Sequence, residues 1–327
     1  MRAVVLEQYG GPEVLSLRDI PDPEIGPEDV LVDVASSAMN RADLLQRMGL
    51  YPGPDTEYEV PGLEFAGTVT AAGPMVRDVA TGDAVMGVVS GGAHAQRLAV
   101  HHRQVLAVPD ALTLADAGAV PEVFLTAWDA LVVQGGLTPG RRALVHAGAS
   151  GVGTAAIQIA KAYGAEVYVT ASASKLEQCL ALGADLAIDY GRDDFADAVR
   201  QVTGGRGVDV VLDVIGGDYV DRNLSCLAVQ GRVVQVGVMA AGEAQINVGR
   251  LLPLRASLIG TVLRARPLEE KIALTKRFGR EVLGWFETGV LAPVIDCRFD
   301  LDQIAAAHEY MASNANVGKI VLDVAPD

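Results

Sequence analysis

Short apolar runs separated by Pro and Gly turns make up about the first 120 residues of the chain. Runs of this length are typical of strands, and their close spacing predicts a compact, barrel-like β unit. The predicted strands cover residues 3–6, 14–18, 29–36, 66–71, 84–88 and 94–100. One helix interrupts them at 41–48, with Asn40 as its N-cap and Gly49 as its end.

From about residue 113 the pattern changes to helices that alternate with apolar strands. This alternation predicts an α/β fold in which helices cover both faces of a parallel sheet. The predicted strands cover 143–146, 166–170, 186–189, 208–214, 232–238 and 257–263, and the predicted helices cover 123–134, 154–163, 194–202 and 219–229.

The last 60 or so residues have too few elements for a core of their own. They predict helices at 269–288 and 301–312 and strands at 293–299 and 319–324. We therefore expect this tail to complete the first domain. The predicted domains are residues 1–122 with 266–327, and residues 123–265.

A glycine-rich turn, Gly148-Ala-Ser-Gly-Val-Gly153, joins the strand at 143–146 to a helix that ends before Gly164. The first N–H groups of a helix have no internal partner, and the helix dipole adds positive charge there. A pyrophosphate could bind these groups if no side chain blocked it, which would explain the glycines. The expected contacts are Gly148, Ser150, Gly151, Val152 and Gly153. Because the spacing differs from the usual G-x-G-x-x-G, a tight turn without a ligand is the alternative.

The end of the next strand indicates which dinucleotide fits. NAD sites place a carboxylate there, about 20 residues beyond the glycines, whereas this chain has Ser172, Ser174 and Lys175. A charge-assisted hydrogen bond from Lys175 to a 2′-phosphate would contribute roughly 1.5–3 kcal/mol, so we expect NADPH. Alternatively, Ser174 and Glu177 form a capping box for the next helix, which is compatible with the same phosphate contact.

The charge balance excludes some partners. The chain has 327 residues, with 26 Lys and Arg against 41 Asp and Glu, which gives a net charge of −15. Nucleic acid and anionic membranes would repel it, and we expect neither as a partner. Its three cysteines are too far apart for a C-x-x-C metal site. No apolar run approaches the ~18 residues of a membrane helix and no signal core is evident, so we expect a cytoplasmic protein.

Several segments are distinctive, among them Asn40-Arg-Ala-Asp43, Pro61-Gly-Leu-Glu-Phe-Ala-Gly67, the 146–153 turn and Val317-Gly-Lys319. They resemble the zinc-independent quinone oxidoreductases of the medium-chain dehydrogenase/reductase superfamily. Within these, the chain is most similar to the tumour-suppressor-inducible quinone oxidoreductase subgroup, relatives of zeta-crystallin. The resemblance covers essentially the whole chain. It implies a GroES-like β-barrel catalytic domain and a Rossmann domain with a doubly wound parallel sheet.

The resemblance also argues against a catalytic metal. Where zinc-dependent members have Cys, His and Cys, this chain has Asn40, Leu63 and Glu122. An amide, an aliphatic chain and one carboxylate do not make a zinc site, so we expect none. The protein would then have to supply orientation, polarisation and a proton.

By resemblance, two residues are expected to be catalytic. Asn40 would face the nicotinamide and the substrate oxygen, although it could serve only as the helix N-cap. Tyr51 would line the substrate cleft, and the matching residue in enoyl-thioester reductases is the suggested proton donor. The alternative for Tyr51 is a turn tyrosine that packs by its ring.

The resemblance implies further cofactor contacts and a partner. These contacts are Thr126, Ser172, Lys175, Tyr190, Gly237, Leu263 and Asn316. His146, at the end of the first dinucleotide-binding strand, could contact the ligand indirectly. The strand at 256–263 would be a sheet edge that pairs with a twin subunit, so we expect a homodimer.

Three functions follow as hypotheses. The first is metal-independent reduction of quinones, with ortho-quinones as the expected acceptors, by NADPH in a cleft between the domains. The second is NADPH-dependent reduction of the C=C bond of an enal, enone or enoyl thioester, with Tyr51 as proton donor. The third is an NADPH-binding sensor with little turnover.

Overall fold

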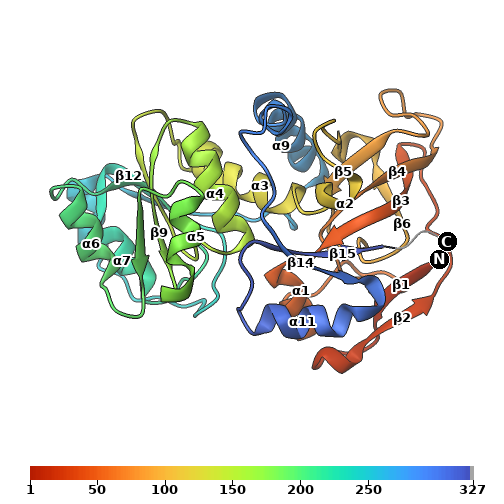
Figure 1. The fold of residues 1–327 in the computed structure, drawn as a ribbon, viewed down its shortest axis with the longest axis horizontal. Coiled ribbons are helices and arrows are strands. Elements are labelled where there is room, and N and C mark those ends of the chain that lie inside the picture. The colour runs from red at the N-terminus through yellow and green to blue at the C-terminus, as the bar shows by residue number, and fades with distance from the viewer. Residues whose placement is uncertain (325–327) are drawn as a thin grey trace. The chain divides into compact units, whose positions relative to one another are not determined.

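The computed structural model describes residues 1–324, and the chain divides into two compact units. Unit 1 comprises Met1–Glu122 and Arg264–Asp327, and unit 2 comprises Val123–Leu263. The second crossing therefore lies between residues 263 and 264, two residues before the predicted position. Each unit is described separately below (Figure 1).

Unit 1 is built on a seven-stranded sheet in the order β14-β15-β3-β4-β5-β7, with β6 pairing β3. The strands are β3 (Asp29–Ala38), β4 (Glu64–Ala72), β5 (Ala84–Val88), β6 (Arg97–His101), β7 (Val105–Ala107), β14 (Ile295–Asp300) and β15 (Lys319–Asp323). A two-stranded sheet pairs β1 (Arg2–Leu6) with β2 (Leu15–Asp19). The tail strand β15 pairs with β3, so the end of the chain completes this sheet and its apolar core.

The helices of unit 1 flank this sheet. They are α1 (Arg41–Arg47), α2 (Leu114–Ala117), α9 (Leu268–Glu281), α10 (Gly284–Glu287) and α11 (Ile304–Ala312). Asn40 precedes α1 and its N–H donates to the Asp43 carboxylate at 2.7 Å, which confirms the predicted helix start. The single helix predicted at 269–288 is wrong, because α9 ends at Glu281 and α10 starts at Gly284. The break falls at Val282 and Leu283, directly before Gly284, and glycine is a poor helix former.

Unit 2 contains a six-stranded parallel sheet in the order β10-β9-β8-β11-β12-β13. The strands are β8 (Arg142–Val145), β9 (Glu166–Ala171), β10 (Leu186–Asp189), β11 (Val208–Asp213), β12 (Leu227–Gln235) and β13 (Ser257–Gly260). This is the doubly wound Rossmann order, whose direction reverses between β8 and β11. The predicted α/β fold is confirmed, and β13 is an edge strand as expected.

Helices cover both faces of this sheet. They are α4 (Gly151–Ala162), α5 (Leu176–Ala181), α6 (Phe195–Val202), α7 (Tyr219–Ser225) and the short α8 (Leu251–Leu254). In Figure 1, α4 and α5 lie on one side of β9, and α6 and α7 lie on the other. The helix α3 (Pro121–Trp128) starts in unit 1, enters unit 2 and continues as a π-helical segment at Asp129–Gln134.

One helix boundary in unit 2 was predicted wrongly. The helix expected at 219–229 ends at Ser225, and the strand expected from residue 232 already begins at Leu227. Val208 of β11 pairs with Leu227, and its N–H donates to the Cys226 carbonyl at 2.9 Å. Pairing with β11 therefore draws residues 227–229 into the sheet, because tertiary contacts override local helix propensity.

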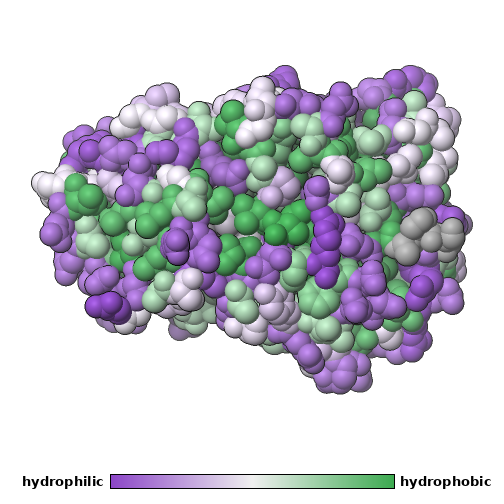
Figure 2. All heavy atoms as spheres, in the orientation of Figure 1, coloured by the Kyte–Doolittle hydropathy of each residue, from purple (hydrophilic) through white to green (hydrophobic). Residues whose placement is uncertain are grey.

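The surface is mixed in character. Hydrophilic residues cover much of the face drawn in Figure 2, with hydrophobic residues between them. Within residues 1–324, every helix is too short or too polar to cross a membrane.

Candidate functional site

The glycine turn of unit 2 presents backbone donors at the start of α4. Ser150 is the N-cap of this helix, and its hydroxyl accepts from the Gly153 N–H at 3.0 Å. The Ser150 carbonyl accepts from Thr154 N–H at 2.8 Å. The described residues offer no acceptor to the N–H groups of Gly151 and Val152, at the first two helical positions. An anion would bind these two groups.

Two of the glycines have a different cause from the expected one. A Cβ on Gly148 would lie 2.6 Å from the Val169 Cβ in β9, and a Cβ on Gly153 would lie 2.3 Å from the Ala147 carbonyl oxygen. Both distances are far shorter than real Cβ contacts. Gly148 and Gly153 are therefore required by the packing of the turn against its own unit, whether or not a ligand is bound.

The predicted adenosine end lies where β9 and β10 finish. Ala171 of β9 pairs with Asp189 of β10, so the residues that follow, Ser172 and Tyr190, lie at the same sheet edge. Lys175 is half-buried in the turn after β9, and Tyr190 is 54% exposed. The structure thus brings together Ser172, Lys175 and Tyr190 at the carboxyl edge, where dinucleotides bind in this fold.

The predicted capping box at Ser174 is wrong. Ala173–Lys175 forms a 3-10 turn, and Lys175 occupies the N-cap position of α5 without a side-chain cap. The Ser174 hydroxyl instead lies 3.5 Å from the Ser172 hydroxyl. The turn places Lys175 one residue before the helix rather than at its first position.

A buried polar chain crosses the point where the strand order reverses. His146, which follows β8, is fully buried and lies 3.0 Å from the Thr170 hydroxyl and 2.7 Å from the Asn223 amide oxygen. The Asn223 amide donates to Asp213, so His146 Nε2 carries the proton and Nδ1 accepts from Thr170. Burial lowers the pKa of His146 and keeps it neutral. This histidine joins β8 to the end of β11 and does not reach the surface.

Asp213 connects these hydrogen-bonded side chains to Gly237, another predicted contact in unit 2. Its carboxylate accepts from the N–H groups of Ile215 and Gly216 at 2.6 and 3.0 Å. Gly237, after β12, donates its N–H to the Asp213 carbonyl at 3.4 Å. The polar chain therefore fixes the turns after β8 and β11 and reaches Gly237 after β12, at one sheet edge.

Three further predicted contacts lie elsewhere. Thr126 is buried in α3, and Leu263 is the last residue of unit 2. Asn316 belongs to unit 1, where it is 9% exposed and donates to the Gly318 carbonyl at 2.8 Å.

Unit 1 contains a buried ion pair beside Asn40. The Lys319 ammonium lies 2.7 Å from Glu64 Oε1 and donates to the Met39 carbonyl at 2.7 Å and to Asn40 Oδ1 at 2.8 Å. The Lys319 and Glu64 side chains are 3% and 0% exposed. Glu64 Oε2 accepts from the Glu122 N–H at 2.9 Å, so both carboxylate oxygens are engaged.

This arrangement limits what Asn40 can do. Its amide nitrogen donates to Glu64 Oε1 at 2.9 Å and to the Ala38 carbonyl at 3.2 Å, which uses both of its hydrogens. Its oxygen accepts from Lys319 and, in the capping box of α1, faces the Asp43 N–H. Asn40 therefore cannot donate a hydrogen bond to a ligand without losing a partner.

Asn40, Leu63 and the neighbouring Glu64 do not fit a zinc ion. Leu63 is a buried aliphatic side chain, the Asn40 amide is engaged, and a lysine ammonium occupies the carboxylate of Glu64. Zinc needs several deprotonated N, S or O ligands in one tetrahedral arrangement. Within residues 1–324, no group of three or more His, Cys, Asp or Glu side chains is placed to hold a metal.

Tyr51 follows α1 and is half-buried. Burial raises the pKa of its phenol, the Arg264 guanidinium opposes this rise and the Glu122 carboxylate adds to it. The hydroxyl has no hydrogen-bond partner among the described residues, so it can donate to a ligand. Sequence reasoning missed Arg264, whose guanidinium carbon lies 4.7 Å from the centre of the Tyr51 ring.

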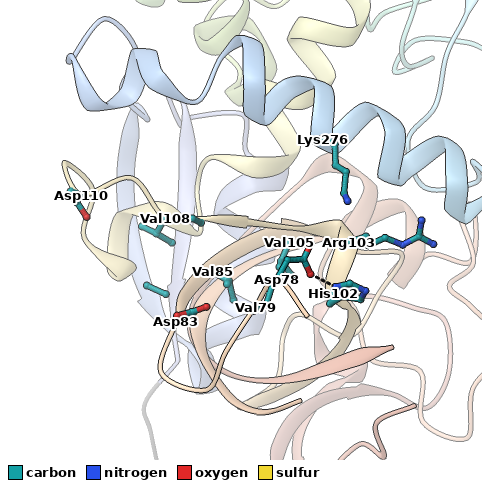
Figure 3. A pocket seen from close by; sticks show the side chains of 12 residues that line it. Asp78, Val79, Asp83, Val85, His102, Arg103, Val105, Val108, Asp110 and Lys276 are labelled. Carbon is teal, nitrogen blue, oxygen red and sulfur yellow. Dashed lines mark hydrogen bonds and ion pairs between the residues drawn. The ribbon is translucent and has the colours of Figure 1, made fainter. Parts of the chain in front are cut away.

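A pocket of about 440 Å³ lies elsewhere in unit 1 (Figure 3). Two of its side chains contact carboxylates, His102 that of Asp78 and Arg103 that of Glu269, while Lys276 reaches toward the pocket from α9. Its lining residues are Asp78, Val79, Asp83, Ala84, Val85, His102, Arg103, Val105, Ala107, Val108, Asp110 and Lys276. None of them is a predicted site residue, so this pocket is separate from the candidate site.

Family models match most of the chain. Residues 26–132 match the alcohol dehydrogenase GroES-like domain, and residues 151–278 match the zinc-binding dehydrogenase model. The second description mentions zinc, which the residues of this chain do not fit.

Two kinds of protein are among the relatives of known sequence. The synaptic vesicle membrane protein VAT-1 homolog of Rattus norvegicus is 31% identical over 344 residues, which cover 100% of this chain and 85% of that protein. The polyketide synthase component PikAII of Streptomyces venezuelae is 38% identical over 307 residues, which cover 92% of this chain. The chain spans only 5–18% of the length of four such polyketide synthases.

Solved structures agree with the fold. Escherichia coli quinone oxidoreductase complexed with NADPH has a TM-score of 0.89 and 27% identity, over 99% of this chain and 100% of that one. The CurK enoyl reductase has a TM-score of 0.88 and 29% identity, over 99% of both chains. The GroES-like sheet, the Rossmann sheet, the two matching models and these relatives together show that the chain belongs to the medium-chain dehydrogenase/reductase superfamily, whose members bind a nicotinamide dinucleotide.

Proposed function

We propose that this protein is a metal-independent, NADPH-dependent reductase of quinones, with ortho-quinones as the preferred acceptors. The observation that carries the proposal is the Lys319–Glu64–Asn40 cluster, whose residues do not fit zinc. It occurs in a chain whose fold binds a nicotinamide dinucleotide, so the reduction has to proceed without a metal. The likeness to a quinone oxidoreductase complexed with NADPH supports the same acceptor class.

The chain's own residues hold the dinucleotide and orient the acceptor. The N–H groups of Gly151 and Val152 bind the pyrophosphate, and Ser172, Lys175 and Tyr190 bind the adenosine phosphate. When bound, NADPH supplies a hydride. Tyr51 presents its hydroxyl to the acceptor oxygen. Quinol oxygens take up protons from water readily, so quinone reduction does not require a protein proton donor.

A panel of acceptors tests the proposal. NADPH oxidation is followed by absorbance with phenanthrenequinone, a crotonyl thioester, an alkenal and no acceptor. We expect the fastest turnover with the ortho-quinone. Faster turnover with the crotonyl thioester or the alkenal would show that the protein is a C=C reductase instead. Tight NADPH binding without turnover of any acceptor would identify a sensor.

C=C reduction is the second candidate because of Tyr51. Its hydroxyl is unpaired among the described residues and burial raises its pKa, so it is a protonated donor at neutral pH. Reduction of an enoyl thioester needs a hydride at one carbon and a proton at the other, which this phenol could deliver. The likenesses to CurK enoyl reductase and to polyketide synthases favour this reading.

Lys175 is expected to select NADPH over NADH. Lys175→Ala should weaken NADPH binding about 10- to 100-fold, because a charge-assisted hydrogen bond contributes about 1.5–3 kcal/mol. NADH binding, measured by the same fluorescence titration, should change little. Lys161→Ala is a matched control, since Lys161 pairs with Asp185 on the surface of the same unit. Equal weakening of both dinucleotides would show that Lys175 does not contact the 2′-phosphate.

We also propose that β13 forms a homodimer contact. It is an edge strand, and the segment from residue 238 to 262 exposes several large apolar side chains: Val238, Met239, Val248, Leu252, Leu258 and Val262. Pairing with a second copy would cover this edge.

Leu258→Asp is expected to dissociate the dimer, because it places a carboxylate on an apolar contact surface. Light scattering after size exclusion should then give the 34.1 kDa monomer, whereas Val202→Asp, on the exposed side of α6, should keep the dimer mass. A wild-type protein that is itself monomeric, or a variant that stays dimeric, would exclude this contact.

A further inference from the structure

Arg264, the first residue of unit 1 after the chain leaves unit 2, binds three separate segments of unit 1. Its Nη1 donates to the Tyr51 carbonyl at 3.0 Å, its Nη2 donates to Gln46 Oε1 at 2.9 Å, and its Nε donates to the Ser90 carbonyl at 2.7 Å. These acceptors lie on α1, on the loop after α1 and on the loop after β5. The guanidinium makes these bonds from three different nitrogens in one plane, a spread that the single ammonium nitrogen of a lysine does not have.

The partners of Arg264 are themselves fixed. Gln46 is fully buried and its amide nitrogen donates to Glu59 Oε1 at 3.0 Å. The same oxygen accepts from the Gly53 N–H at 3.2 Å. A Cβ on Gly53 would lie 2.6 Å from the Gln46 amide nitrogen, so the loop packs closely over this contact. The segment that carries Tyr51 is therefore tied to Arg264 both directly and through Gln46.

The same guanidinium covers one face of the Tyr51 ring, at 4.7 Å from the ring centre. A cation at this distance is attracted to the ring face. The backbone and the ring of Tyr51 are thus both held by one side chain, whereas its hydroxyl keeps no partner among the described residues. The result is an oriented phenol whose donor group is available.

We propose that Arg264 is a positioning residue for Tyr51, which it holds so that the hydroxyl is presented to the acceptor. The inference rests on the proposed function, in which Tyr51 faces the acceptor. Arg264 also acts on the phenol electrostatically, because its charge lowers the pKa of Tyr51 against the effects of burial and of Glu122. The charged groups that face Arg264 are Asp43, Glu59 and Lys271.

A double-mutant cycle separates this role from a general structural one. The proteins are the wild type, Arg264→Met, Tyr51→Phe and the double variant, measured as kcat/KM with a crotonyl thioester, the acceptor whose reduction uses the Tyr51 hydroxyl. Loss of orientation should lower kcat/KM of Arg264→Met about 10- to 100-fold. In the Tyr51→Phe background the same change should have an effect below about twofold. Equal losses in both backgrounds would overturn the proposal.

A titration decides the question even if no acceptor is found. The alkaline absorbance change of Tyr51 is obtained as the difference between proteins with and without this tyrosine. In Arg264→Met it should move to higher pH, because the cation that lowers the pKa is gone, whereas Arg264→Lys should keep most of the wild-type position. An unchanged titration in Arg264→Met would refute the inference, while absence of turnover would refute only the proposed function.

Two controls complete the design. Urea unfolding shows whether Arg264→Met folds. If it does not, Arg264→Lys takes its place in the cycle, because the lysine keeps the positive charge but not the three-way contact. Arg103→Met removes an arginine that pairs with Glu269 on the surface of the same unit and should leave kcat/KM unchanged. NADPH affinity should be the same in all variants, since Arg264 acts on the acceptor side.

Discussion

Replacing Tyr51 with Phe is expected to lower kcat for an enoyl thioester by about 10²–10⁴-fold, the usual range for loss of a general acid. The variant keeps the ring under the Arg264 guanidinium and loses only the hydroxyl, which has no partner among the described residues to disturb. Reduction of an ortho-quinone should change by less than about threefold, because its oxygens can be protonated by water. The two acceptors are compared at saturating NADPH.

The pH dependence gives an independent check on Tyr51. Burial raises the pKa of its phenol above the ordinary value near 10, so the group stays protonated throughout the neutral range. The kcat for C=C reduction should therefore be flat from pH 6 to about 9 and fall only at higher pH, where the phenol ionises. A fall through neutral pH would assign the proton to a different group. A quinone rate that drops as far as the enoyl rate would make Tyr51 essential to both reactions.

Replacing Lys319 with Met is expected to lower the free energy of unfolding by about 3–5 kcal/mol, the cost of breaking a buried ion pair by removing one partner. The Glu64 carboxylate would remain in a fully buried position without its cation, and Asn40 and Met39 would each lose a donor. Urea unfolding, followed by circular dichroism, measures the change.

Two comparison variants make the Lys319 result specific. Lys276→Met removes an exposed lysine from α9 and should change the free energy of unfolding by less than about 0.5 kcal/mol. Lys319→Met combined with Glu64→Gln should recover part of the loss, because the unpaired charge is gone. If Lys319→Met and Lys276→Met were equally stable, the buried pair would have no net effect on folding.

Much of the fold could be predicted because its elements obey local rules. The parallel strands of unit 2 are continuous apolar runs, and β10 and β5 have the predicted bounds. Errors occurred where distant contacts decide the conformation. Residues 227–229 form good helix sequence locally, but pairing of β12 with β11 makes them a strand. The two glycines at 279 and 284 inside an otherwise helical pattern were too weak a signal to predict the break between α9 and α10, since Gly279 remains within α9.

The candidate site was predictable in part. The glycine turn and the residues after β9 follow from spacing, because both lie at the carboxyl edge of neighbouring strands. Lys319 belongs to a segment that resembles the family, but its contact with Glu64 joins residues 255 positions apart and has no sequence signature. Arg264 is similarly remote from Tyr51 along the chain. Its position beside the second predicted domain crossing is the signal in the sequence that could have pointed to it.

The tight packing of Gly148 and Gly153 bears on how this family diverges. Selection for folding alone retains these two glycines, since any side chain would collide with Val169 or with the backbone at Ala147. A descendant that had abandoned the dinucleotide would thus carry the same spacing for as long as it kept α4 against β9. Drift away from the proposed chemistry should appear first at positions that are proposed to contact ligands, such as Lys175 and Tyr51. Homologues are therefore better sorted by those two positions than by their glycine pattern.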